Sequence, residues 1–78
     1  MNNLTKEIRA YALKNAIEFG KADAGRILPK LFQHGLEKSE IKETMSVISG
    51  IVKEVNMLSK EQKEKEFEAL KGLVKEKD

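Results

Sequence analysis

The spacing of apolar residues constrains the fold of this chain more than any other feature of its sequence. Apolar side chains recur every three or four residues over most of the 78 residues, and polar and apolar residues nowhere alternate long enough to predict a strand. The first such stripe comprises Leu4, Ile8, Tyr11, Ala12, Ala16 and Phe19, widened by Leu13 and Ile17. The pattern predicts an all-α fold, a small bundle of about four helices with these stripes as its core.

The first two helices have recognisable ends. The first helix is expected to begin after Asn2 or Asn3 and to run to about Glu18, with Gly20 supplying a left-handed stop. A second helix is expected over residues 24 to 33, with Asp23 before it as a cap and Gly35 after it.

Two residues inside the second helix disfavour a regular start. Pro29 lacks an N–H and clashes with the carbonyl four residues earlier, which predicts a kink or a late helix start near Arg26. Gly25 is a weak helix former, so it suggests a close backbone approach or a late cap.

The third helix is expected from about Ser39, its cap, to Leu58. At this length it is the longest predicted element, so we expect it to form the spine of the bundle. Gly50 in its middle indicates either a tight helix crossing, which we favour, or a mild weakness of the helix. Its main apolar stripe comprises Ile41, Met45, Ile48, Val52 and Val55, broadened by Val47, Ile51 and Leu58.

A fourth helix is expected from Lys60 to about Lys71. Ser59 and Gln62 before and within its first turn have the spacing of a capping box. Its sizeable apolar residues lie late, which predicts docking by its C-terminal half, and they are Phe67, Leu70, Leu73 and Val74. The sequence therefore predicts one helical domain over residues 1–72 and a charged tail or linker start over residues 73–78.

Composition limits the class of protein. Lys+Arg 15, Asp+Glu 13, one His and no Cys in 78 residues allow one small domain and exclude a two-domain enzyme. The longest uninterrupted apolar stretch is residues 10–13, whereas a membrane span needs about 20 residues. The first nine residues lack the apolar block of a secretory signal, and the lack of Cys agrees with a reducing compartment, so we expect a cytoplasmic protein without membrane contact.

Residues suited to catalysis or metal binding are few. His34 is the only imidazole, and its neighbours place it at a helix end, where a structural or merely exposed role is expected. Glu61, Glu64 and Glu68 are stacked at helical spacing and could hold a divalent ion, but nearby lysines explain them as surface ion pairs. No Gly-rich phosphate loop is present. We therefore expect no catalytic residue, no metal site and no cofactor in this chain.

Positive charge gathers in the first half of the chain. Residues 1–35 carry a net charge of +3 and residues 36–78 a net charge of −1. Lys21, Arg26 and Lys30 surround the start of the second helix, whose exposed amides would also face an anion. Phosphate binding and a merely solvated helix end both account for this arrangement.

Two parts of the sequence resemble a known family. The first runs from Tyr11 to Ala16 (YALKNA) and continues with Gly20-Lys21-Ala22, Gly25 and Lys30-Leu31; the second runs from Val52 to Ser59 (VKEVNMLS) and continues with Glu61-Gln62. In this order they resemble the N-terminal helical region of archaeal glutamyl-tRNA synthetases, over roughly residues 8 to 70. Pro29 departs from the pattern.

The resemblance implies a non-catalytic, appended domain of a glutamate-tRNA ligase. Synthetases of this class carry a HIGH-type motif and a KMSKS-type loop in a Rossmann domain, and neither is present here. The resemblance thus implies that ATP and Mg²⁺ serve the parent enzyme, and that tRNA and the catalytic domain are this domain's partners. The residues expected to contact tRNA phosphates are Lys14, Lys21, Arg26 and Lys30. Arg26 is the best suited of them, because its guanidinium group can donate two hydrogen bonds to one phosphate.

Two other roles fit the same sequence. The chain could be a protein-protein interaction module that docks a partner through apolar surface on the third and fourth helices, or it could be a structural spacer. A contiguous basic face would favour RNA, and a large exposed apolar patch would favour a protein partner.

Overall fold

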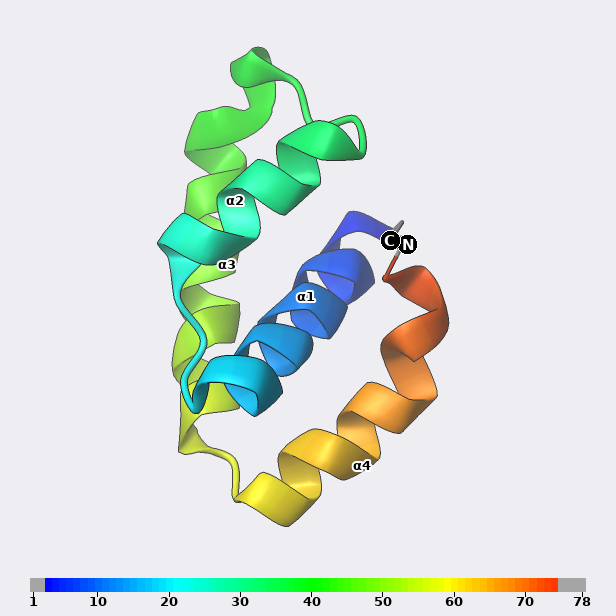
Figure 1. Ribbon diagram of the computed structural model, residues 1–78. Coiled ribbons are helices and arrows are strands. Elements are labelled where there is room, and N and C mark those ends of the chain that lie inside the picture. The colour runs from blue at the N-terminus through cyan, green and yellow to red at the C-terminus, as the bar shows by residue number, and fades with distance from the viewer. Residues whose placement is uncertain (1–2, 75–78) are drawn as a thin grey trace.

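The computed structural model describes residues 3–74. They form four α-helices and two short 3-10 helices, and no strand occurs within this range (Figure 1). In chain order the elements are α1 (Asn3–Phe19), α2 (Ala24–Gln33), η1 (Lys38–Glu40), α3 (Ile41–Met57), α4 (Lys60–Leu70) and η2 (Lys71–Leu73). The predicted all-α bundle of four helices is confirmed. Asn2 and most of the predicted tail, residues 75–78, lie outside the described residues.

The central helix of the bundle is α1. It runs between α2 and α3 on one side and α4 on the other, and it contacts all three (Figure 1). Four consecutive α1 residues, 10–13, are at most 3% exposed. A helix that is buried on every side has to be apolar on every side, and this stretch is. The prediction that the third helix forms the spine is therefore wrong, since α3 is no longer than α1 and lies to one side.

The core is built by α1, α2 and α3 and closed by α4. Its largest fully buried side chains are Ile8, Leu13, Ile27, Leu31, Ile48 and Val55. No residue of α4 is fully buried. Phe67 and Leu70 in its second half, and Val74 after it, pack against the core, which confirms docking by the C-terminal half.

Some residues of the predicted stripes lie outside the core. Ile17 is 39% exposed, Phe19 58% and Val47 40%. Beside Ile17, the first half of α4 contributes Lys60 and Lys63. The periodicity marked all three side chains as core residues, but neighbouring elements cover them only in part.

The turn between α1 and α2 follows the predicted chemistry. Gly20 has a φ of +83°, which confirms the left-handed stop after α1. The Asp23 side chain accepts a hydrogen bond from the Gly25 amide at 2.9 Å and caps α2. The helix consequently begins at Ala24 and includes Pro29, so of the two outcomes predicted at Pro29, a kink or a late start near Arg26, the late start is wrong. A Cβ on Gly25 would lie 3.3 Å from the capping carboxylate, so glycine leaves room for the cap.

The starts of α3 and α4 differ in their caps. Ser39 lies inside η1 and is not a cap; the N–H of Glu37 instead donates to Glu40 Oε1 at 3.0 Å, and α3 begins at Ile41. The predicted crossing at Gly50 is also wrong, because this residue is exposed and no atom lies within 4 Å of the position of a Cβ. Ser59 caps α4 as predicted, its Oγ accepting from the Gln62 amide at 3.1 Å, whereas the Gln62 side chain donates to Glu66 Oε2 at 3.1 Å, further along α4.

Arg9 joins three helices. Its Nη1 donates to Glu54 Oε1 on α3 at 2.8 Å, and its Nε and Nη2 donate to Glu66 Oε1 on α4 at 2.9 and 2.7 Å. Hydrogen bonds from Gln62 and from Arg9 lower the pKa of the Glu66 carboxyl group. This network links α1 to both α3 and α4.

Candidate nucleic-acid interface

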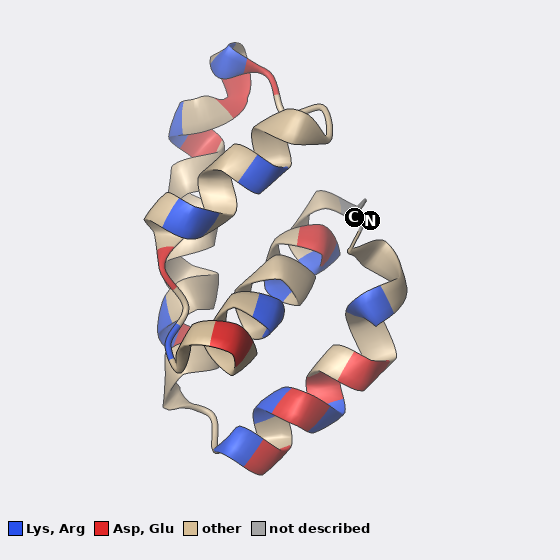
Figure 2. Cartoon of the chain, in the orientation of Figure 1, with Lys and Arg blue, Asp and Glu red and all other residues tan. Residues whose placement is uncertain are grey.

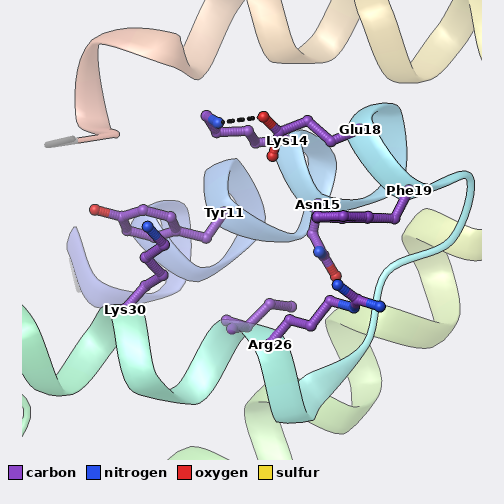
Figure 3. Close-up of a pocket in the computed structure, with 8 residues that line it drawn as sticks. Tyr11, Lys14, Asn15, Glu18, Phe19, Arg26 and Lys30 are labelled. Atoms are coloured by element: carbon purple, nitrogen blue, oxygen red, sulfur yellow. Dashed lines mark hydrogen bonds and ion pairs between the residues drawn. The ribbon is translucent and has the colours of Figure 1, made fainter. Parts of the chain in front are cut away.

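A cleft of about 260 Å³ lies between α1 and α2. The α1 side contributes a wall that includes one buried amide and one exposed aromatic ring, and α2 contributes two cations (Figure 3). The lining residues are Tyr11, Lys14, Asn15, Glu18, Phe19, Arg26, Ile27 and Lys30. This is the part of the described chain in which predicted functional residues come together.

Three of the four predicted phosphate-binding residues line this cleft. Lys14 comes from α1, and Arg26 and Lys30 come from α2, a helix without any acidic residue (Figure 2). Lys30 extends toward Tyr11, at the end of the cleft away from Arg26 (Figure 3). The fourth residue, Lys21, is exposed on the turn between the helices and does not line the cleft.

Sequence reasoning missed the aromatic ring in the cleft. Phe19, the last residue of α1, was expected in the core and instead presents its ring to Arg26, whose Cζ lies 4.0 Å from the ring centroid. Such cation–π contacts at exposed sites are worth about 0.5–1 kcal/mol. Phe19 is the last residue of its apolar stripe and directly precedes the helix stop at Gly20. This position in the sequence indicated that its ring could lie outside the core.

One carboxylate partly neutralises the positive charge of the cleft. Lys14 Nζ lies 2.8 Å from Glu18 Oε2, one turn further along α1. Glu18 also lines the cleft, so its lining carries three cations against one anion. The charged residues of the lining therefore carry a net charge of +2, and two of the three cations, Arg26 and Lys30, come from α2.

The start of α2 does not offer its amides to an external anion as expected. The Asp23 carboxylate accepts a hydrogen bond from the Gly25 amide, and the Arg26 amide donates to the Asp23 carbonyl at 3.0 Å. Because an N-cap side chain satisfies the same amides that an anion would use, this part of the expected phosphate geometry is wrong. Anion binding at the cleft has to rely on side chains.

Two asparagines hold the turn that positions α2. Asn15, which is 7% exposed, accepts a hydrogen bond from the Asp23 amide at 2.7 Å. Asn56 on α3 accepts from the Ala22 amide at 2.7 Å and donates to the Ala22 carbonyl at 3.1 Å. The two asparagines and Ala22 all belong to the strings on which the family resemblance was based, and the fold brings them together. The cleft is consequently braced from both α1 and α3.

The remaining titratable candidates have structural surroundings. His34 is the C-cap of α2 and stacks on Tyr11, with ring centroids 5.9 Å apart, in agreement with the helix-end position predicted. Glu68 pairs with Lys71 at 3.0 Å on the surface. Within residues 3–74, no group of three or more possible metal-ligating side chains comes together. None of the helices in this range is both long and apolar enough to cross a membrane.

Comparison with curated proteins finds a similarity to part of a tRNA ligase. The chain is 36% identical over 73 residues to the glutamate–tRNA ligase of Methanosphaera stadtmanae. The match covers 91% of this chain but 13% of that protein, so the chain corresponds to a small part of its relative. No protein-family profile and no solved structure matches the chain. The similarity supports a domain related to glutamyl-tRNA synthetases.

Proposed function

We propose that this chain is a non-catalytic domain of a glutamate–tRNA ligase of the archaeal type, appended N-terminally to the catalytic domain, and that it helps to hold tRNA during aminoacylation. The similarity to a glutamate–tRNA ligase over 91% of the chain supports the parentage. The observation that carries the tRNA-binding role is the cleft between α1 and α2, where Lys14, Arg26 and Lys30 come together. In this proposal, activation of glutamate with ATP and Mg²⁺ belongs to the rest of the cytoplasmic enzyme.

The charges of the cleft suit a phosphate backbone. Arg26 and Lys30 lie one helical turn apart on α2, at i and i+4, so both side chains leave the same helix face. Phosphate contacts through such side chains fix the position of a nucleic acid without reading its sequence. Contact with about three phosphates predicts a slope of log affinity against log salt of roughly −2 to −3. We therefore expect weak, salt-sensitive binding that contributes orientation more than specificity.

A charge-reversal experiment tests this role. The double variant R26E/K30E reverses the two α2 cations of the cleft, and K42E/K53E reverses two exposed lysines of α3 with the same change in net charge. Binding of labelled tRNA is measured by fluorescence anisotropy at several salt concentrations. We expect R26E/K30E to bind at least about tenfold more weakly with a shallower salt slope, and K42E/K53E to bind much like the parent.

The same experiment separates the alternatives. Equal losses in both double variants would show that only net charge matters and would refute the cleft. Unchanged tRNA binding by R26E/K30E would favour a protein-docking module or a spacer instead. The single variant Lys21→Glu measures the contribution of the one predicted residue outside the cleft.

A further inference from the structure

We infer that the cleft between α1 and α2 receives an unpaired nucleotide of the RNA, with its base against the Phe19–Arg26 stack and its phosphate between Arg26 and Lys30. The inference rests on the proposed function, because it specifies which part of an RNA the same site takes. It concerns single-stranded RNA, in contrast to the backbone of a duplex.

The exposed ring of Phe19 is the first observation that carries this inference. Burial of a phenylalanine is a major source of stability in so small a domain, yet this ring is 58% exposed at the edge of a positively charged cleft. Phosphate binding alone requires no aromatic side chain. Single-stranded nucleic acids, however, are held by a combination of cations along the backbone and aromatic rings on which bases stack. Phe19 with Arg26 and Lys30 is such a combination.

The arrangement of Arg26 adds a second surface for a base. Its guanidinium carbon lies over the Phe19 ring, 4.0 Å from the ring centroid. Both phenylalanine rings and arginine guanidinium planes serve as stacking partners for unstacked RNA bases. A base can therefore stack on the free side of either group while the neighbouring phosphate remains within reach of the cations. In a duplex the bases are already stacked, so they cannot use this surface.

The size and rigidity of the cleft agree with one nucleotide. Its volume of about 260 Å³ is near the lower end of small-molecule sites, which are typically about 300–1,000 Å³. A helix of RNA cannot enter a cleft of this size. Tyr11 forms a buried wall at 3% exposure, and the side-chain oxygens of Asn15 and Asn56 accept hydrogen bonds from the backbone of the turn that precedes α2. The site is consequently formed before the ligand arrives.

The test compares an unstructured RNA of eight nucleotides with a hairpin of the same nucleotide composition, both binding to the full 78-residue chain. Phe19→Ala removes the ring, and Phe19→Leu keeps apolar bulk without a π face. Phe32→Ala is the control, since Phe32 is also a partly exposed phenylalanine but does not line the cleft. Melting curves by circular dichroism confirm that each variant is folded.

We expect the single strand to bind more tightly than the hairpin. Both Phe19 variants should weaken single-strand binding about tenfold and leave hairpin binding almost unchanged, while Phe32→Ala changes neither. Equal affinity for the two RNAs, or no effect of the Phe19 variants, would overturn the inference and leave the proposed function intact. No binding of either short RNA would overturn the inference, whereas no binding of tRNA by the parent chain in the same assay would refute the proposed function itself.

A last comparison separates a strand from a free nucleotide. AMP offers the same base and phosphate chemistry without neighbouring phosphates. Affinity for the oligonucleotide that exceeds affinity for AMP by at least about tenfold supports a strand that also contacts further cations. Equal affinity for the two would overturn RNA as the occupant of the cleft.

Discussion

Replacement of Asn56 by alanine is predicted to destabilise the whole domain. This side chain is the link between α3 and the turn before α2, and it contacts both backbone polar groups of Ala22. Ala22 is 1% exposed, so its N–H and C=O groups have little access to water when Asn56 is removed. The effect therefore includes two lost hydrogen bonds and the desolvation penalty of two buried groups.

The magnitude follows from these two contacts. A typical intramolecular hydrogen bond contributes about 1 kcal/mol net, and a buried group left without a partner costs about 1–3 kcal/mol. Because Asn56 is itself only half-buried, water can enter the vacated site and recover part of this penalty. We expect Asn56→Ala to lower the free energy of unfolding by about 2 kcal/mol, which for a domain of this size lowers Tm by about 8–16 °C.

Thermal and urea unfolding followed by circular dichroism measure this loss. Met57→Ala is the matched control: it truncates the neighbouring residue of the same helix end, which is 85% exposed, and should change the free energy of unfolding by less than about 0.5 kcal/mol. A melting temperature of Asn56→Ala within about 2 °C of that control would refute the reasoning, because the turn would then be held by other contacts.

The variant Asn56→Asp tests the donor half of the contact. Its carboxyl group keeps an acceptor for the Ala22 amide, but the ionised form faces the Ala22 carbonyl without a proton to donate. Folding therefore favours the protonated form and raises the pKa of the new group above its usual value of about 3.9. The destabilisation should be full above the raised pKa and should diminish as the pH falls through it.

Three further substitutions test the fold. Hydrogen bonds from Gln62 and Arg9 lower the pKa of Glu66 in the folded state. The ionised Glu66 side chain therefore stabilises the fold above the usual carboxyl pKa of about 4.3, and this stabilisation is lost as the pH falls through the folded-state pKa. Glu66→Gln should cost about 1 kcal/mol at neutral pH, and the difference in Tm should vanish in acid. A difference that is independent of pH would contradict this. Gly20→Ala should cost about 1–2 kcal/mol, because φ there is +83° while the space around a Cβ is empty, so backbone strain alone acts. Gly50→Ala should stabilise the domain by about 0.5–1 kcal/mol in the same melts, since this exposed glycine lies in the interior of α3; destabilisation would indicate a contact at this position.

Local chemistry predicted the ends of several helices. The stop at Gly20, the cap at Asp23 and the cap at Ser59 depend on residues within three positions of one another, and all three are confirmed. Short-range caps are readable because the geometry they require is set by the backbone of one turn. The same local rules failed at Ser39, where Glu37 and Glu40 cap each other and begin η1 earlier.

The candidate site was predictable in part. The concentration of cations in the first half of the chain indicated Lys14, Arg26 and Lys30, and the fold places all three at one cleft. The exclusion of Lys21 and the occupation of the α2 amides by Asp23 depend on how the turn is folded. Charge counts along a sequence do not contain that information.

By itself, the sequence determined the helical class, most helix ends and the half of the chain that carries positive charge, since periodicity and capping act within one or two turns. Only the tertiary structure decided that α1 is central, that Phe19 faces the cleft and that Asn56 holds Ala22. These features join residues up to 34 positions apart in the case of Asn56. An apolar stripe indicates which face of a helix avoids water, but the surrounding helices decide how much of that face is covered. A polar side chain such as Asn56 gains a structural role only when the fold brings a distant backbone group within hydrogen-bond distance.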